Sequence, residues 1–212
     1  MAHIASGGGW QTLITLVNTG GGAAQAQLNF LDEHGNPMAL PLLFPQTGVV
    51  STMSSVSQTL AAGASLLIQT QGQAAQVGSA HLTTAGSVSG FAIFQRSGQE
   101  AVVPIATGAA SSIALAFDNT SGLVNGVALA NSSGFQVAVP VTLYNDKGAL
   151  LGTTSINLPA NGHTSFILKD QFPAAANILG SVVFSSGGGQ IAALGIRATA
   201  AGAYTSIPAM AQ

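Results

Sequence analysis

Residues 117–134 read FDNTSGLVNGVALANSSG, and the stretch IASGGGWQTLITLVNTGG at 4–21 matches them position by position. The matched pairs are Ile4 with Phe117, Gly9 with Gly122, Ile14 with Val127, Leu16 with Leu129, Asn18 with Asn131 and Gly21 with Gly134. The register continues without a gap through Leu28/Val141, Phe30/Leu143, Asp32/Asn145 and Gly35/Gly148. These matches indicate an internal duplication, so the fold of one copy is expected to predict the fold of the other.

Apolar residues in both copies recur at every second position, which is the period of a β-strand with one buried face. The pattern is clear in TLITLVN (12–18) and QAQLNFLD (25–32), and it returns at 127–129 and 139–143. Pro140 lies inside the last of these strands. Because proline cannot donate to a β-ladder, Pro140 predicts an edge strand or a bulge at that point.

Polar turns with a late glycine, DEHGN (32–36) and NDKGA (145–149), separate the predicted strands in each copy. Glycine supplies the positive φ that such turns need, so both segments are predicted to be hairpin turns. Periodic helical faces are almost absent. The best helical candidate is a turn or two within LKDQFPAAAN (168–177).

Further matches continue towards the end of each copy. LAAGASLLI (60–68) resembles LPANGHTSFIL (158–168), which sets Gly63 opposite Gly162. The first copy has additional residues before this match, which predicts an insertion at about 41–58. Each copy supplies about seven short strands, as in an immunoglobulin-type sandwich.

The predicted fold class is therefore all-β, with two tandem immunoglobulin-like antiparallel β-sandwich domains related by internal duplication. The first domain is assigned to residues 1–106 and the second to residues 107–212. The boundary falls in the small-residue stretch ATGAASS, 106–112, which is short for a linker. The two domains are accordingly expected to pack against each other.

Only 5% of the 212 residues are charged, and the formal net charge is −2. An average soluble domain has roughly 25% charged residues, so charge repulsion contributes little to keeping this chain dispersed. Self-association is therefore expected to be easy. The basic residues are Arg96, Lys147, Lys169 and Arg197. So few cations argue against nucleic acid and anionic membrane surfaces as partners.

The chain has no cysteine, which removes disulfides, zinc-thiolate sites and thiol catalysis together. No apolar run is long enough for a spanning helix, so no membrane insertion is expected. The N-terminal MAHIASGGGW lacks the basic and apolar regions of a signal peptide. A mature secreted protein with a start Met would read in this way, and a fragment of a larger secreted chain is equally consistent with it.

Catalytic and metal-binding motifs are not evident, and we predict a protein that is not an enzyme, with no cofactor and no metal. GSVSG at 86–90 has valine where a nucleophile elbow needs serine. The histidines, at positions 3, 34, 81 and 163, show no metal-ligand spacing. His34 and His163 are expected to be solvated, next to turns. His81 lies within a predicted strand.

Two local oxygen clusters remain as calcium candidates, Asp32 with Glu33 and Asp118 with Asn119. The simpler interpretation is that these side chains bond their own turn backbone. An enzyme with a groove site near Asp118, Glu100 and Arg96 is a third and weaker alternative.

Exposed aromatic side chains are the usual platform for sugars on β-sandwiches. The amphipathic aromatics here are Trp10, Tyr144 and Tyr204, which are the candidate ligand-binding residues. Trp10 matches Leu123 and Tyr144 matches Leu31, so ordinary packing at the edge of a core is the alternative explanation.

Several strings resemble a paired repeat module of secreted and surface-anchored bacterial proteins: GGWQTLITLVNTG, DEHGNP, GFAIFQ, QEAVVP, AFDNTSG, GVALAN, LPANGHTSF, DQFP and ALGIR. The resemblance covers nearly all of residues 3–208. It implies a tandem immunoglobulin-like sandwich outside the cell that acts as a spacer, adhesive or assembly unit, without assigned activity or catalytic residues.

The leading hypothesis is thus a non-enzymatic structural, adhesion or self-assembly module, located outside the cell or at the cell surface. Its expected partners are further copies of itself, in a homo-oligomer or filament, or a cell-surface or extracellular polymer. The alternative is a carbohydrate-binding module that uses exposed aromatics or the groove between the domains.

Overall fold

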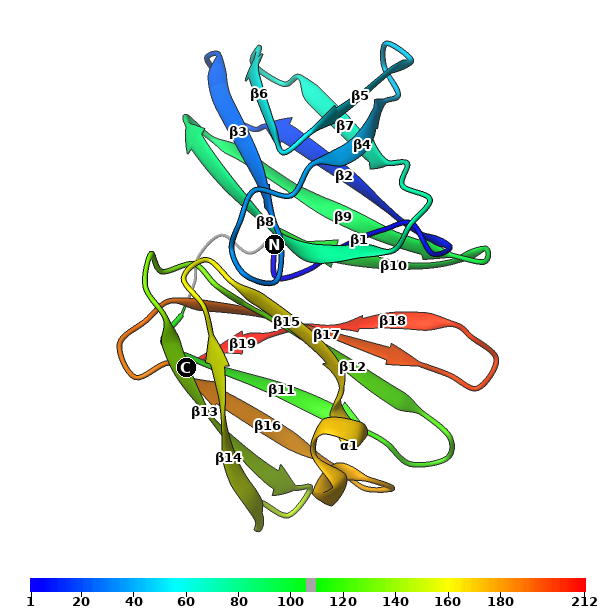
Figure 1. Ribbon diagram of the computed structural model, residues 1–212, viewed down its shortest axis with the longest axis vertical. Helices are drawn as coiled ribbons and strands as arrows, with labels where there is room; N and C mark the ends of the chain where they lie inside the picture. Colours follow the sequence, from blue (N-terminus) through cyan, green and yellow to red (C-terminus); the bar gives the residue numbers. More distant parts are fainter. Residues whose placement is uncertain (106–109) are drawn as a thin grey trace. The chain divides into compact units, whose positions relative to one another are not determined.

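The computed structural model describes residues 1–105 and 110–212, and the chain divides into two compact units. Residues 3–105 make up the first unit and residues 110–212 the second. The predicted boundary at residues 106 and 107 lies outside the described residues. Nearly all regular structure in both units is antiparallel β-sheet (Figure 1), as the period-two pattern predicts.

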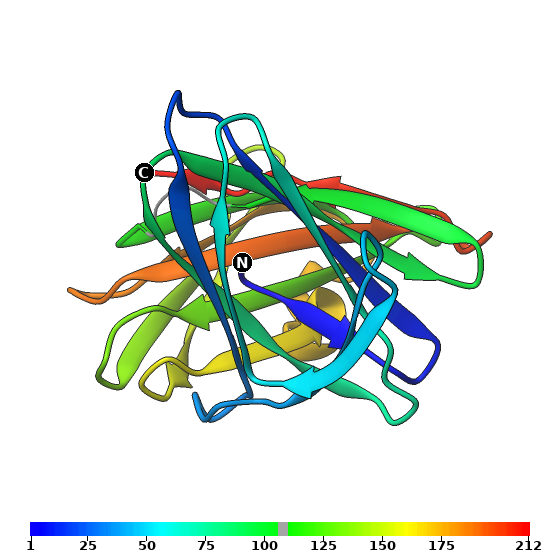
Figure 2. The ribbon, with the colours of Figure 1, turned by 90° about the horizontal axis from the view of Figure 1, so that it is seen from above.

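The first unit contains two antiparallel sheets. Their strands are β1 (Ile4–Ser6), β2 (Trp10–Asn18), β3 (Ala24–Leu31), β4 (Leu40–Phe44), β5 (Val49–Met53), β6 (Ser55–Leu60), β7 (Ser65–Thr70), β8 (Gln76–Ala85), β9 (Val88–Arg96) and β10 (Gln99–Pro104). One sheet has the order β1-β8-β3-β6 and the other β10-β9-β2-β7-β4-β5. Seen from above, strands of this unit cross one another in two layers (Figure 2).

The core of the first unit lies between these sheets. Ile14 and Phe30, predicted to face inwards, are both 0% exposed and come from different sheets. A buried polar contact also joins the layers: the Thr12 hydroxyl donates to the Ala5 carbonyl at 2.7 Å. The two sheets are therefore fastened by apolar packing and by a satisfied internal hydrogen bond.

The second unit also contains two antiparallel sheets. Its elements are β11 (Ser112–Asp118), β12 (Val124–Asn131), β13 (Val137–Asn145), β14 (Leu150–Leu158), β15 (His163–Ile167), α1 (Leu168–Gln171), η1 (Pro173–Ala175), β16 (Leu179–Ser185), β17 (Ile191–Ala198), β18 (Tyr204–Ile207) and β19 (Met210–Ala211). The sheet orders are β14-β13-β16-β11-β19 and β15-β12-β17-β18. The helical turn predicted within 168–177 is confirmed as α1 and η1.

The strand order of one unit can be laid over that of the other. β1-β8-β3-β6 corresponds to β11-β16-β13-β14, and β10-β9-β2-β7 corresponds to β18-β17-β12-β15. The register agrees as well, since Ile4 pairs with Gly78 where Phe117 pairs with Gly180. At both glycines an added Cβ would overlap a carbonyl oxygen of the neighbouring strand. The sequence match at 4–21 and 117–134 is thus accompanied by the same strand pairing.

Two buried asparagines make the same contacts in the two units. The Asn18 amide donates to the carbonyls of Gly22 and Ala61 at 2.7 and 3.1 Å. The Asn131 amide donates to those of Phe135 and Pro159, both at 2.8 Å. In each case the side chain ties the loop after its own strand to the loop before β7 or β15, and these bonds satisfy the buried amide group of the asparagine.

The predicted insertion at about 41–58 forms an extra hairpin and an edge strand. The turn at 32–36 is followed by one isolated β-bridge, between Leu31 and Pro37, and not by a hairpin strand. The chain then continues into the six-stranded sheet. There β4 and β5 add two strands beyond β7, and β6 then returns to pair with β3. The hairpin expected at this turn is therefore found only in the second unit, where 145–149 connects β13 directly to β14.

β13 as a whole is an inner strand, but its ladder to β16 begins only at Val141, so at Pro140 the strand is paired on one side alone, as predicted for an edge. The register irregularity lies later, between Leu143 and Tyr144. One finer prediction is wrong. The predicted match of Gly63 with Gly162 is shifted by one residue. Gly63 (φ 73°) corresponds to Asn161 (φ 56°), because asparagine can also adopt the left-handed conformation.

Candidate interaction surfaces

Trp10, the first candidate ligand-binding residue, begins β2 and is half-buried. Its cross-strand partner on β9 is Arg96, whose guanidinium carbon lies 5.2 Å from the centre of the Trp10 ring. Such a cation–π contact occupies an aromatic face and is favourable. The geometry of Trp10 is thus that of a packed residue at the end of a sheet.

Tyr144 and Tyr204 are also half-buried, and they lie on different sheets of the second unit. Tyr144 is on β13 beside the register irregularity and pairs with Leu150. Tyr204 begins β18 and pairs with Ala198. The two tyrosines therefore do not share one sheet face as a common platform.

The carboxylates that were calcium candidates bond their own turns. Asp32 accepts hydrogen bonds from the backbone N–H groups of His34 and Asn36, both at 2.8 Å. These bonds outweigh the opposing effect of partial burial and hold the pKa of Asp32 below its ordinary value. The Thr120 hydroxyl and backbone N–H donate to the Asp118 carboxylate at 2.7 and 2.9 Å, and these bonds lower the pKa of Asp118. Both sites have the geometry of an Asx turn.

Three of the four histidines, His3, His34 and His81, belong to the first unit, and His163 belongs to the second. His34 is exposed in its turn, as expected, whereas the prediction that His163 is solvated is wrong: it is 3% exposed, in β15. His3 packs on the ring of Phe94 with centroids 5.5 Å apart, and burial lowers its pKa to about 4. Burial also lowers the pKa of His81, and the positive charge of the N-terminus lowers it further.

No group of three or more His, Cys, Asp or Glu residues that could hold a metal ion is found within 1–105 and 110–212. The residues of the weaker enzyme alternative belong to different units. Arg96 and Glu100 flank the turn between β9 and β10, and Asp118 ends β11. Across the described part of the chain, no helix has both the length and the apolarity to cross a membrane.

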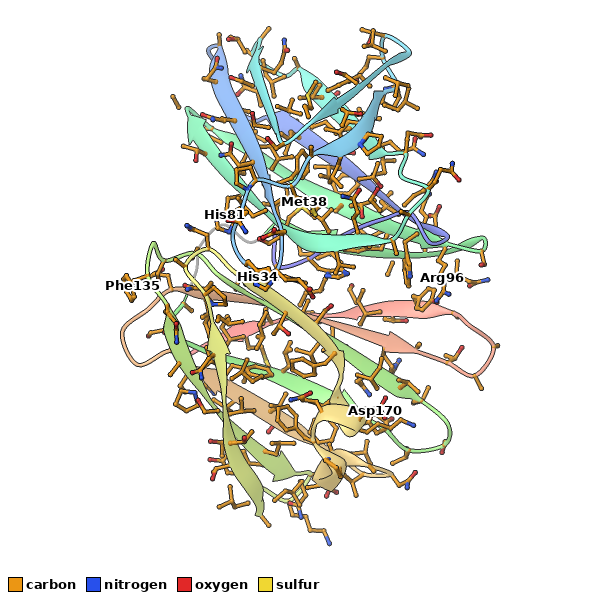
Figure 3. All side chains as sticks on the ribbon, viewed as in Figure 1. His34, Met38, His81, Arg96, Phe135 and Asp170 are labelled. Carbon is orange, nitrogen blue, oxygen red and sulfur yellow. The ribbon has the colours of Figure 1, made fainter. Side chains whose placement is uncertain are left out.

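A shallow hollow of about 450 Å³ is found in the second unit beside Phe135, which is 58% exposed. Phe135 is labelled in Figure 3. It is lined by Phe135, Gln136, Val137, Ala138, Pro140, Ser186, Gly187, Gly188 and Gly189. The lining combines an exposed aromatic ring with neutral polar groups and glycine backbone. Such a surface suits a neutral ligand that has one apolar face.

The hollow exists because β16 ends early. The ladder between β13 and β16 covers Val141–Asn145, so residues 137–140 are paired only with β14. The chain turns away through Gly187 and Gly188, which have φ of 57° and 128°. In the first unit β8 continues to Ala85 and pairs β3 back to Gln25, so that sheet has no such gap.

Sequence reasoning did not single out Phe135. A usable signal is present in the matched stretches of sequence, because Phe135 in NSSGF stands where NTGGG has Gly22. A large apolar side chain that replaces a loop glycine has no neighbouring strand to pack on. It is therefore a candidate for exposure even without a structure.

The edges of the sheets form the second candidate surface. The edge strands are β1, β6, β5 and β10 in the first unit and β14, β19, β15 and β18 in the second. Within the described residues, Glu100 on β10 is the one Asp, Glu, Lys or Arg on any of them. Natural sheets usually protect their edges with charge, proline or a covering segment. Here charge and proline are confined to β10, which carries Glu100 and Pro104, and the other described edge strands have neither.

The longest edge strand is β14, with nine residues of sequence LLGTTSINL and neither charge nor proline. Thr153, Ser155 and Asn157 on its outer face are exposed, and Leu150 at its start is 61% exposed. Across the described chain, no backbone hydrogen bond other than its ladder to β13 is found for Leu150–Leu158. Its outward N–H and C=O groups thus have no backbone partner within the described residues, and the neighbouring element beyond this ladder is η1, which lies close to β14.

A scan against protein-family models, a search of the curated proteins and a search of the solved structures each found no match to this chain.

Proposed function

We propose that this chain is a non-enzymatic structural module, built from two duplicated immunoglobulin-like β-sandwiches, that assembles with copies of itself outside the cell. Duplication is supported by the matched strand orders and by the two equivalent asparagine networks. The extracellular location is supported by the resemblance to secreted repeat modules and by the charge-poor composition, and the absence of cysteine is compatible with it.

The observation that carries the assembly proposal is the chemistry of the sheet edges. An edge strand presents a row of N–H and C=O groups to any strand that approaches it, and charged side chains are the common means of preventing this. With a net charge of −2 and almost no charge on its edges, the chain has little electrostatic repulsion to overcome.

Sedimentation velocity from micromolar to millimolar protein tests this proposal. We expect the weight-average mass to rise with concentration above the monomer value of 20.9 kDa. Raising the ionic strength should change the association little, because few charges are involved. A protein that remains monomeric at millimolar concentration would contradict the assembly function.

A second candidate function is carbohydrate binding, favoured by the hollow beside Phe135. An exposed ring can stack on the apolar face of a sugar, while Gln136 and the glycine loop offer neutral hydrogen-bonding groups. A glycan array provides the search. Phe135→Ala should abolish any hit, whereas the control Phe91→Ala, which removes an exposed ring of the first unit, should leave it unchanged.

A further inference from the structure

We infer that the self-association uses one particular contact: β14 pairs antiparallel with β14 of a second copy, about a two-fold axis close to Ser155. This inference rests on the proposed assembly function and names the surface that carries it. The pairing would join the five-stranded sheets of two copies into one continuous sheet.

The choice of a second copy as occupant follows from self-complementarity. An antiparallel strand pair has two-fold symmetry, so one edge strand can serve as both halves of the contact. β14 has no charge and no proline, and it is longer than the six-residue β6 or the five-residue β5. By contrast, Glu100 and Pro104 lie on the edge strand β10.

The register follows from the alternation of faces. Thr154 and Ile156 pair with the buried Val141 and Val139, so they lie on the core side, and Ser155 lies on the outer side opposite Pro140. When Ser155 pairs with Ser155 of the second copy, Thr154 pairs with Ile156 of the second copy. Core-side residues then meet core-side residues, as a continuous sheet requires.

The register irregularity defines the end of the contact. β13 pairs Leu143 with Gly152 but Tyr144 with Leu150, which leaves Leu151 as an extra residue. A bulge interrupts pairing, so the regular edge runs from Gly152 to Leu158. Because a contact of this length is at the small end of protein interfaces, its Kd is expected in about the micromolar to millimolar range.

The first test uses a matched pair of variants. Ser155→Lys puts two ammonium groups directly opposite each other across the axis, which is destabilising in a strand pair. Ser57→Lys adds the same charge to the exposed centre of β6, where Ser57 pairs with Gln27 as Ser155 pairs with Pro140. We expect Ser155→Lys to weaken dimerisation at least tenfold and Ser57→Lys to change it less than twofold.

The second test exploits the pairing of Ser155 with itself. Ser155→Lys and Ser155→Glu should each be monomeric alone, and an equimolar mixture should recover the dimer, because opposite charges then face each other. The absence of native cysteine allows a third readout: Ser155→Cys should form a disulfide-linked dimer on mild oxidation. Opposed residues of an antiparallel pair have Cα atoms about 4.5–5.5 Å apart, within disulfide range.

The outcomes separate the two proposals. A wild-type chain that is monomeric at millimolar concentration contradicts both. A wild-type chain that associates while Ser155→Lys associates equally well, or while Ser57→Lys is equally disruptive, overturns the β14 contact and leaves assembly standing. Circular dichroism of each variant at low concentration should match the wild type, since both serines are exposed.

Discussion

The two units share a strand order but differ in the strands that come after the same turn. Asn145 accepts backbone bonds from Lys147 and Ala149, as Asp32 does from His34 and Asn36. In the second unit the chain then forms the long free edge β14. In the first, two additional strands join the opposite sheet before the short edge β6 forms.

This difference shows that the two units share their strand pairing through the buried positions and not through the connections between strands. The pairing of β3 with β8 and of β13 with β16 keeps the same register although the segments between the strands differ in length and path. The polar link between layers is also kept with different residues: the Thr12 hydroxyl bonds the Ala5 carbonyl, and the Asn125 amide bonds the Asp118 carbonyl. Surface features such as β14 and the Phe135 hollow can therefore change without loss of the core.

The largest effect is expected from Gly78→Ala and Gly180→Ala. In each variant the new Cβ would overlap the carbonyl oxygen of Leu31 or Tyr144, so strands must move apart. Each should lower the free energy of unfolding of its own unit by about 3 kcal/mol or more. Urea denaturation followed by NMR resolves the units. Gly152→Ala, which meets open space, is the control, and a cost below about 1 kcal/mol at Gly180 would contradict the close approach.

The buried asparagines come next. Asn18→Ala and Asn131→Ala each remove a buried side chain that bridges two loops, and the loop carbonyls lose their amide donor. Each should destabilise its unit by about 2–3 kcal/mol. If the two networks are equivalent, the two costs should agree within about 1 kcal/mol in urea titrations. A large loss of stability in one variant and almost none in the other would contradict the equivalence of the two asparagine networks.

Acid should weaken the first unit through His3. Burial lowers the pKa of this side chain from 6.5 to about 4, so between these values the unfolded chain binds the proton more readily. Stability contributed by neutral His3 is thus present above pH 6.5 and is lost as the pH falls towards 4. Since His3 is only half-buried, we expect a loss of about 1–2 kcal/mol. His3→Gln should flatten this slope, and an unchanged slope would contradict the assignment.

The smallest effect concerns the left-handed turn residue before β7 and β15. Gly63→Ala and Asn161→Ala should each cost about 1 kcal/mol, because alanine tolerates positive φ poorly. Asn161→Gly should be nearly neutral. Thermal melts of the three variants check this, and a neutral Asn161→Ala would show that the position does not need its left-handed conformation.

The alternation of apolar residues was sufficient to predict the all-β class and the buried faces. Ile14, Phe30, Val127 and Leu143 are all buried, because a period of two leaves one choice of inner face once a strand is assumed. The helical turn within 168–177 was also predictable, from its composition.

Remote pairing could not be predicted in the same way. The local pattern does not encode that β4 and β5 join the sheet of β7, that β13 has β16 on its other side, or that His163 is buried. These features depend on which strands meet from distant parts of the chain. The Phe135 hollow likewise depends on where β16 stops, which the glycine run at 187–189 indicates only as a loop.

Hydrogen exchange at low and high protein concentration tests assembly through β14 most directly, because it reads the edge strands one by one in the intact chain. We expect the amides of Gly152–Leu158 to gain protection as the protein is concentrated, while those of the β10 edge, Gln99–Val103, do not. Protection that is independent of concentration at β14, or that rises equally along both edges, would contradict this assembly.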